Sequence, residues 1–211
     1  MFFVNLFIKQ IKMSKIITNI DDLDLNGSYT YADYLLWQFS ERLEIIKGKI
    51  FKMSPAPTRN HQQVSLKLTR EIDKIFINHS CELYVAPFDV RLINFKKSTS
   101  DKQIITVVQP DLCVVCDLNK LDEKGCLGAP NLIIEILSKG NSKKDLTIKF
   151  DLYEENGVQE YWIVNPSEKD VHIYTLQNGK YIGSRPFIME TEIQSPTFPE
   201  LKFEVDKIFE V

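Results

Sequence analysis

The chain has 211 residues, of which 44% are hydrophobic and 11% aromatic, and this suits one folded domain with a sizeable core. Its 26 basic and 29 acidic residues leave a formal net charge of -3. That balance excludes the broad positive surface of a constitutive nucleic-acid coat protein, although a local basic surface remains possible.

The N-terminal segment, residues 1–29, is predicted to be a partly disordered extension in front of a single domain at residues 30–211. Its apolar run is too short to span a bilayer, and it has neither a preceding positive region nor a small-residue cleavage site. We therefore expect no membrane segment and no signal peptide. Met13 begins an ordinary-looking start, so residues 1–12 are expected to be a wrongly assigned upstream start or a disordered tail.

The cysteines are expected to be free thiols in the core. Cys113 and Cys116 have CxxC spacing, but they lie in LCVVC, a strand-like run in which they would point to opposite faces and could not share an ion. Cys81 and Cys126 add no second CxxC. Free thiols fit a reducing cytosol, so a cytoplasmic location is expected.

The predicted elements begin with helices and hairpins. Thr30 can cap a helix over residues 31–41, and residues 43–53 predict a β-hairpin turning at Lys47 and Gly48. Thr58 or Asn60 can cap a long helix with apolar residues at helical spacing. Next come a strand pair broken near Pro87 and the strand-forming sequence ITVVQPDLCVVCD.

The second half predicts a loop over residues 118–130, a strand NLIIEIL, and a helix that ends at Gly157. Strands follow in EYWIV, VHIYTL and KYIGSR, with Asn178-Gly179 as a hairpin turn. This order predicts a mixed α/β domain with one layer of sheet flanked by helices.

Two acidic residues interrupt this pattern of apolar strands. Asp111 enters one apolar run after Pro110, and Glu135 lies inside another, LIIEIL. A carboxylate in such a run must be paired, protonated or bound to a metal. If neighbouring strands bring both to one face, their hard oxygens can hold Mg²⁺ or Mn²⁺. Such a metal would neutralise a scissile phosphate and lower the pKa of a bound water.

A site of this kind also needs a cation. The position two residues after the glutamate is Leu137, so Lys149 is the best substitute, because the following helix can pack back against the strand. Lys143 and Lys144, near the start of that helix, are expected to contact phosphate together with its free N–H groups.

The residues also have simpler interpretations. Asp111 could cap a turn after proline, and Glu135 could form a purely structural buried ion pair with Lys149. His61 could be a solvated or capping residue at a helix start, and Glu44, in a half-polar hairpin, is expected at the surface unless it faces the cleft. The lysine cluster could be a solvated face.

Taken together, the order and spacing of these motifs resemble the Uma-two family of proposed endonucleases, within the PD-(D/E)xK restriction-endonuclease-like superfamily. The resemblance extends from about Tyr31 to Tyr181 and rests on the motifs LEIIKGKIFKMSPAPTRNH, PD, GAPNLIIEILS and EYWIV. Further matching positions are His61, Asp145, Lys149 and Tyr153.

The resemblance implies a restriction-endonuclease-like mixed β-sheet flanked by helices, with Asp111 and Glu135 as metal ligands and Lys149 as a displaced catalytic lysine. Glu44 and His61 could approach the same site. Ser138 and Asp145 could support it. The chain departs from the family pattern at Leu137, where the usual lysine is absent, and in SKG, where the family has SPS.

The function implied is a metal-dependent endonuclease that uses Mg²⁺ or Mn²⁺ to hydrolyse phosphodiester bonds of nucleic acid, with DNA the expected substrate. A homodimer would supply two active sites for the two strands. The alternative is a non-catalytic nucleic-acid-binding or scaffold domain that keeps the fold and uses Glu135 and Lys149 as a structural ion pair.

Overall fold

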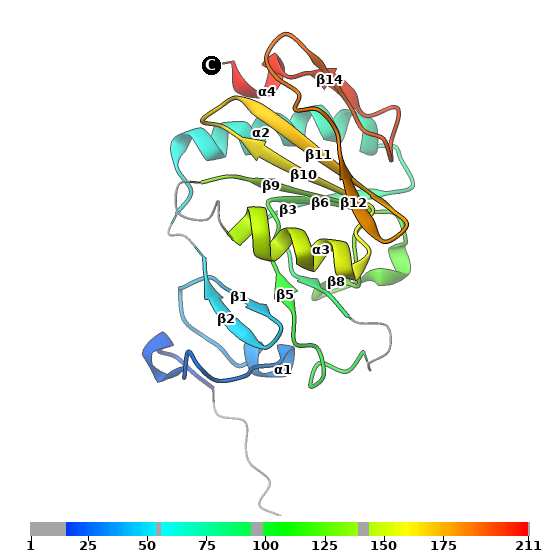
Figure 1. Ribbon diagram of the computed structural model, residues 1–211. Helices are drawn as coiled ribbons and strands as arrows, with labels where there is room; N and C mark the ends of the chain where they lie inside the picture. Colours follow the sequence, from blue (N-terminus) through cyan, green and yellow to red (C-terminus); the bar gives the residue numbers. More distant parts are fainter. Residues whose placement is uncertain (1–15, 54–55, 94–98, 139–143, 211) are drawn as a thin grey trace, which may run out of the picture.

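The computed structural model describes residues 16–53, 56–93, 99–138 and 144–210, and for Lys144 and Asp145 it describes the backbone alone. A six-stranded mixed sheet lies at the centre of the fold, in the order β12-β11-β10-β9-β6-β3 (Figure 1). Its strands are β3 (Glu82–Val85), β6 (Leu112–Val115), β9 (Leu132–Ile136), β10 (Glu160–Asn165), β11 (Asp170–Gln177) and β12 (Lys180–Gly183). Only the β9–β10 pair among them is parallel, which requires a crossover between these two strands.

One side of this central sheet is covered by the long helix α2 (Arg59–Phe76). The Thr58 side chain caps it by accepting a hydrogen bond from the His61 N–H, as predicted. The C-terminal elements β13 (Glu192–Gln194), β14 (Lys202–Glu204) and α4 (Asp206–Phe209) complete the same layer (Figure 1). The helix contributes a buried stripe at helical spacing, formed by Val64, Leu68, Ile72 and Phe76.

The other side is covered by α3 (Phe150–Asn156) and a second six-stranded sheet, in the order β2-β1-β5-β4-β8-β7 (Figure 1). Its strands are β1 (Leu43–Ile46), β2 (Lys49–Lys52), β4 (Val90–Arg91), β5 (Val107–Val108), β7 (Leu121–Asp122) and β8 (Gly125–Leu127). Mixed α/β architecture is therefore confirmed, but the prediction of a single sheet layer is wrong.

The chain passes from one sheet to the other at Gln109-Pro110-Asp111. The sequence suggested one continuous strand region here, yet β5 belongs to the second sheet and β6 to the central one. Pro110 has no N–H with which to continue a ladder, so the strand ends there. The turn therefore stands between the two sheets.

Three local predictions need correction. The first helix, α1 (Tyr31–Tyr34), ends early because the chain leaves it to pair with Ile17, which bridges Trp37. The predicted loop over residues 118–130 contains a 3₁₀ turn, η2 (Leu118–Lys120), and the β7–β8 hairpin. The helix after β9 begins as a π-helical segment, η3 (Lys144–Lys149), before α3. The hairpin turns at Lys47-Gly48 and Asn178-Gly179 are confirmed.

Part of the predicted N-terminal extension packs against the domain. Residues 1–15 lie outside the described range, but a 3₁₀ turn, η1 (Ile20–Asp22), follows them. Ile20 and Leu23 are buried in a cluster with Leu43 of β1. The predicted boundary between extension and domain stays a prediction.

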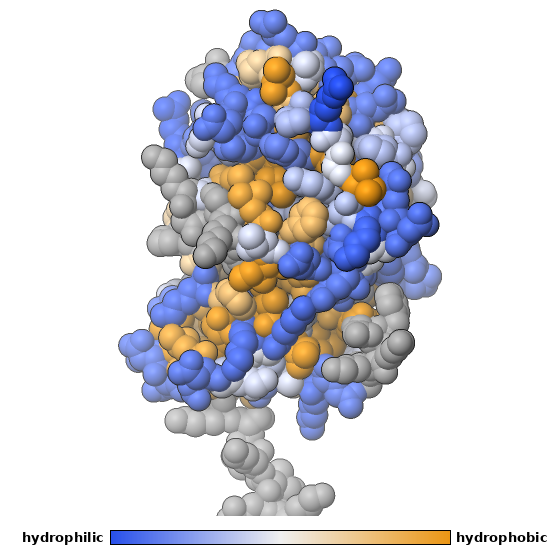
Figure 2. Space-filling view, in the orientation of Figure 1, coloured by the Kyte–Doolittle hydropathy of each residue, from blue (hydrophilic) through white to orange (hydrophobic). Residues whose placement is uncertain are grey.

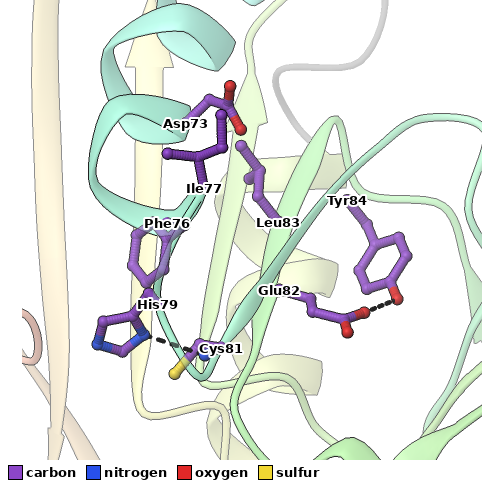
Figure 3. Close-up of a pocket in the computed structure, with 8 residues that line it drawn as sticks. All are labelled: Asp73, Phe76, Ile77, His79, Cys81, Glu82, Leu83 and Tyr84. Atoms are coloured by element: carbon purple, nitrogen blue, oxygen red, sulfur yellow. Dashed lines mark hydrogen bonds between the residues drawn. The ribbon is translucent and has the colours of Figure 1, made fainter.

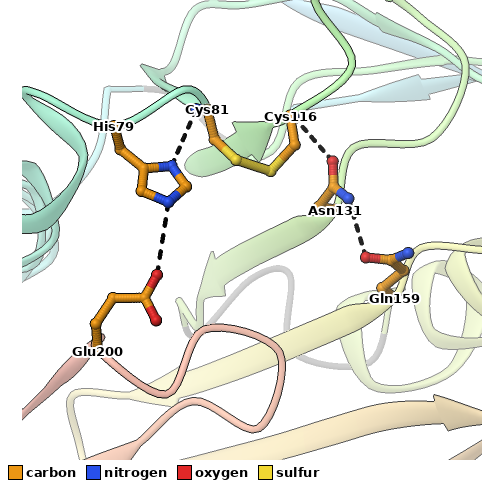
Figure 4. Close-up of a disulfide and its surroundings, with 6 residues drawn as sticks. All are labelled: His79, Cys81, Cys116, Asn131, Gln159 and Glu200. Atoms are coloured by element: carbon orange, nitrogen blue, oxygen red, sulfur yellow. Dashed lines mark hydrogen bonds and ion pairs between the residues drawn. A yellow bond between two sulfur atoms is a disulfide. The ribbon is translucent and has the colours of Figure 1, made fainter.

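Two cysteines form a disulfide, so the prediction of four free thiols is wrong for Cys81 and Cys116 (Figure 4). They lie just beyond the β3–β6 ladder, in which Glu82 pairs with Val115, so the register places them opposite each other. Cys113 and Cys126 are free and buried. Thiol content therefore no longer supports a cytosolic location, which stays a prediction.

The face shown in Figure 2 is mostly hydrophilic, with apolar patches around α3 and the β1–β2 hairpin. No helix in the described ranges is both long and apolar enough to cross a bilayer.

Candidate active site

The three carboxylates of the candidate site come from neighbouring points of the two sheets. Glu135 lies in β9 of the central sheet, and Asp111 directly precedes β6. Because Leu112 pairs with Ile134, the antiparallel register places Asp111 beside Glu135. The Ile136 N–H donates to Asp111 Oδ2 at 2.8 Å, which fixes this carboxylate against the end of the ladder. The register thus places Asp111 opposite Glu135 on neighbouring strands, and their joint use as metal ligands stays a prediction.

Strand alternation decides which way Glu135 points. Ile134 and Ile136 pack on the α2 side of the sheet, whereas Ile133 packs on the α3 side. Glu135 shares the direction of Ile133, because successive side chains of a strand point to opposite faces. Its carboxylate therefore enters the core between the central sheet and the second sheet.

Lys149 lies between two buried glutamates. Its Nζ is 2.6 Å from Glu135 Oε1 and 2.9 Å from Glu44 Oε1. The Lys149 and Glu135 side chains are 3% and 5% exposed, and that of Glu44 is fully buried. Two carboxylates thus contact one ammonium in the core.

Glu44 was expected at the surface unless it faced the cleft, and the surface position is wrong, because Glu44 is buried and contacts Lys149. It lies in β1, all of whose residues are buried, because the second sheet turns this strand toward the central sheet. The Gln109 N–H donates to Glu44 Oε1 at 3.1 Å. The same turn that carries Asp111 therefore also holds Glu44.

The helix after β9 supplies two side chains to Glu135. Lys149 is the last residue of η3, and Tyr153 lies one helical turn later in α3, so both project from the same face. The Tyr153 hydroxyl donates to Glu135 Oε1 at 2.6 Å. Burial, and then the charges of Glu135 and Glu44, raise the pKa of Tyr153 well above its usual range, so the hydroxyl remains a donor. Tyr153 was already among the positions that match the family, and its four-residue spacing from Lys149 explains why both side chains reach Glu135.

His61 reaches the site from the first turn of α2. Its Nε2 lies 3.3 Å from Asp111 Oδ2, so an imidazole and a backbone N–H contact the same carboxylate oxygen. The α2 N-terminus, with its positive end of the helix dipole, is therefore close to Asp111. His61 therefore contacts Asp111, and its part in the site stays a prediction.

The other predicted residues are less completely described. Ser138 is half-buried just after β9. Lys143 lies outside the described residues, and Lys144 and Asp145 have a described backbone alone, at the start of η3. Leu137 is half-buried and packs against the core on the α3 side, so this position is used for packing.

The donor set fits a hard divalent cation in kind. Carboxylate oxygens are the ligands that Mg²⁺ and Mn²⁺ prefer. The described arrangement is not a closed cage, because Lys149 stands between Glu44 and Glu135, and no group of three or more His, Cys, Asp or Glu side chains in the described ranges could hold a metal ion. Asp111 and Glu135 remain the candidate ligands.

A cavity of about 330 Å³ lies elsewhere, at the C-terminal end of α2 and the edge strand β3 (Figure 3). It contains none of the predicted site residues, and Glu82, one of its acids, accepts a hydrogen bond from Tyr84. Its lining is Asp73, Phe76, Ile77, His79, Cys81, Glu82, Leu83 and Tyr84.

Comparisons with known proteins agree with this architecture. The family model Uma2, described as "Putative restriction endonuclease", matches residues 31–206. An uncharacterised protein, slr1290, from Synechocystis sp. (strain ATCC 27184 / PCC 6803 / Kazusa) is 26% identical over 149 residues, which cover 67% of this chain and 71% of the relative. A crystal structure described as a "putative nuclease belonging to DUF820" from Anabaena variabilis ATCC 29413 superposes with a TM-score of 0.65 at 21% identity, covering 86% of this chain and 97% of that one.

Proposed function

The chain belongs to the Uma2 family of restriction-endonuclease-like proteins, and from that premise we propose that it is a metal-dependent endonuclease that hydrolyses phosphodiester bonds in DNA. The single observation that carries the proposal is the buried cluster in which Glu44 and Glu135 both contact the Lys149 ammonium, with Asp111 opposite Glu135 on the neighbouring strand. Carboxylates beside a lysine are the groups with which a protein can hold a divalent cation and stabilise charge on a phosphate.

In this proposal Asp111 and Glu135 hold Mg²⁺ or Mn²⁺. The metal, when bound, would polarise the scissile phosphate and lower the pKa of a water. Glu44 holds and orients the Lys149 ammonium through the 2.9 Å contact, while Tyr153 donates to Glu135 and restricts its rotation. His61 and the Ile136 N–H do the same for Asp111.

Lys149 is proposed to orient the attacking water or to stabilise negative charge that develops on the phosphate. It takes this part from the following helix, since Leu137 occupies the position two residues after Glu135. Lys143 and Lys144 are proposed to contact phosphate on the substrate side. A homodimer would supply two such sites, one for each strand of a duplex.

Nicking and linearisation of supercoiled plasmid DNA test this function, with Mg²⁺, with Mn²⁺ and with EDTA. The expected result is metal-dependent cleavage by the wild type and loss of cleavage in Asp111→Asn and Glu135→Gln. Glu168→Gln is the matched control, because Glu168 is an exposed acid in the β10–β11 turn. Cleavage that persists in Asp111→Asn would overturn the site assignment.

A second candidate function is a nucleic-acid-binding or scaffold domain without catalysis. The observation that favours it is the close contact of Lys149 with Glu135, which can serve as a structural ion pair. It predicts that no metal supports cleavage by the wild type and that Asp111→Asn leaves binding of nucleic acid unchanged. The plasmid assay therefore separates the two candidates.

A further inference from the structure

Arg42, which is outside the predicted site, is hydrogen-bonded to Gln109, the residue that also donates to Glu44. Arg42 immediately precedes β1, and its carbonyl accepts a hydrogen bond from the Met53 N–H, which continues the β1–β2 ladder to this residue. Arg42 and Glu44 lie two positions apart on an extended strand, so their side chains point to the same side. Unlike Glu44, Arg42 is exposed.

Gln109 fixes the direction of the Arg42 guanidinium. Gln109 Oε1 accepts from Arg42 Nε at 3.1 Å and from Nη2 at 2.7 Å. Arg42 can only donate, so the amide oxygen of Gln109 must face it. One edge of the guanidinium is thereby occupied, and the edge formed by Nη1 and the outer Nη2 N–H points elsewhere.

The amide nitrogen of Gln109 is also hydrogen-bonded. Its Nε2 donates to Asp89 Oδ1 at 2.8 Å and to the Tyr34 hydroxyl at 3.2 Å. Reversing the amide would place its NH₂ group against the Arg42 donors and its oxygen against the Asp89 carboxylate, so the hydrogen bonds with Arg42 and Asp89 would be lost. The orientation of Arg42 is thus set by a network and not by its own rotamer preference.

The charge of Arg42 is not neutralised by this arrangement. Its partner is a neutral amide, and across the residues that the structure describes no carboxylate lies within salt-bridge distance of it. An oriented guanidinium with one open edge matches a phosphate in the bidentate geometry that arginine forms with oxyanions.

We propose that Arg42 binds a backbone phosphate of the nucleic acid at the edge of the site, and that Gln109 is a positioning residue that couples this phosphate contact to Glu44. The proposal rests on the proposed function, whose substrate is DNA. It adds a contact on the second sheet, through which the substrate would touch both sheets at once.

Binding of a short fluorescein-labelled duplex DNA, measured by anisotropy at several salt concentrations, tests the proposal. The measurements use EDTA and the Asp111→Asn background, so that binding is read without cleavage. Arg42→Gln is expected to weaken binding about tenfold and to reduce the slope of log K against log salt by about 0.9, the value for one phosphate contact on B-DNA. A purely structural role would leave that slope unchanged.

Three further variants separate the effect of the Arg42 charge from that of its orientation. Arg42→Lys should keep the slope of log K against log salt, because the positive charge remains. It should bind DNA more weakly, because lysine lacks the bidentate geometry of the guanidinium. Gln109→Met should also keep the slope and bind roughly threefold more weakly, as expected for the loss of a hydrogen bond. Arg185→Gln, which removes an exposed arginine after β12, is the matched control and should affect binding least. Urea unfolding of each variant shows whether the fold is kept.

The outcomes separate this inference from the proposed function. Wild-type cleavage together with an unchanged salt slope in Arg42→Gln would overturn the inference and leave the function standing. Arg42-dependent binding without cleavage in any metal would support the inference and contradict the endonuclease. Absence of DNA binding would overturn the inference directly.

Discussion

The Lys149 ammonium lies 2.6 Å from the Glu135 carboxylate in a core from which both side chains are almost completely excluded from solvent. This contact joins the end of η3 to the middle of β9, and the same ammonium reaches Glu44 of the second sheet. One lysine therefore links the crossover helix to both sheets, which makes it important for folding as well as for the proposed chemistry.

Substitution of Lys149 by Met should strongly destabilise the protein. The change keeps the length of the side chain but leaves Glu44 and Glu135 buried beside each other without a cation. Breaking a buried ion pair by removing one partner costs about 3–5 kcal/mol. The free energy of unfolding in urea measures this loss. Lys180→Met, which breaks the solvated pair with Glu154, is the control, and an equal loss in both variants would contradict the assigned importance of Lys149.

Removal of the Tyr153 hydroxyl should lower stability by about 1–3 kcal/mol, because a hydrogen bond to a buried charged group is lost and Glu135 keeps its charge. Tyr153→Phe is compared in urea unfolding with Tyr174→Phe. Tyr174 is half-buried, and its hydroxyl makes no hydrogen bond within the described ranges. The prediction fails if the two variants lose the same amount.

The cysteines give a direct count. In denaturant without a reductant, a thiol reagent should find two reactive thiols, those of Cys113 and Cys126, because Cys81 and Cys116 are joined. After reduction it should find all four. In the folded protein none should react quickly, since burial raises the pKa of Cys113 well above its usual range and that of Cys126 to about 11. Four thiols before reduction would show that the disulfide is absent.

Asp89 should make stability depend on pH. Burial raises the pKa of this carboxyl above its ordinary value of 3.8 in the folded protein, despite the hydrogen bond from Gln109. The folded state then holds the proton more tightly than the unfolded state, so the contribution of Asp89 is fully present below about pH 3.8 and is lost as the pH rises through the raised folded pKa. Relative to wild type, Asp89→Asn should therefore gain stability between pH 4 and pH 7. A constant difference between the two proteins over this range would exclude the effect.

The sequence was sufficient to find the acidic pair because each carboxylate interrupts a run of apolar residues, and burial leaves such groups few alternatives. It also identified Lys149, since a crossover helix after β9 must pack back on the sheet. Glu44 could not be recognised as buried in this way. The sequence pattern of its hairpin is the same whether the inner face contacts water or a second sheet. Only the tertiary structure shows which of the two it contacts.

The two-sheet architecture and the disulfide were not predicted, because both depend on how distant strands pair. Strands β4, β5 and β7 have two residues each, too few to show a period. Cys81 and Cys116 are 35 residues apart, and they meet because β3 pairs with β6 in a particular register. Sequence spacing alone does not specify a register between distant strands.

The residues of the candidate site are far apart in the sequence, which decides when the site can form during synthesis. Glu44 leaves the ribosome early, Asp111 and Glu135 follow, and Lys149 and Tyr153 come after all three. Until Lys149 has been synthesised, the growing chain contains Glu44, Asp111 and Glu135 but not the ammonium that contacts Glu44 and Glu135. A nascent chain therefore carries no assembled site, and any DNA-cleaving activity would begin only when synthesis has passed α3 and both sheets have closed upon it.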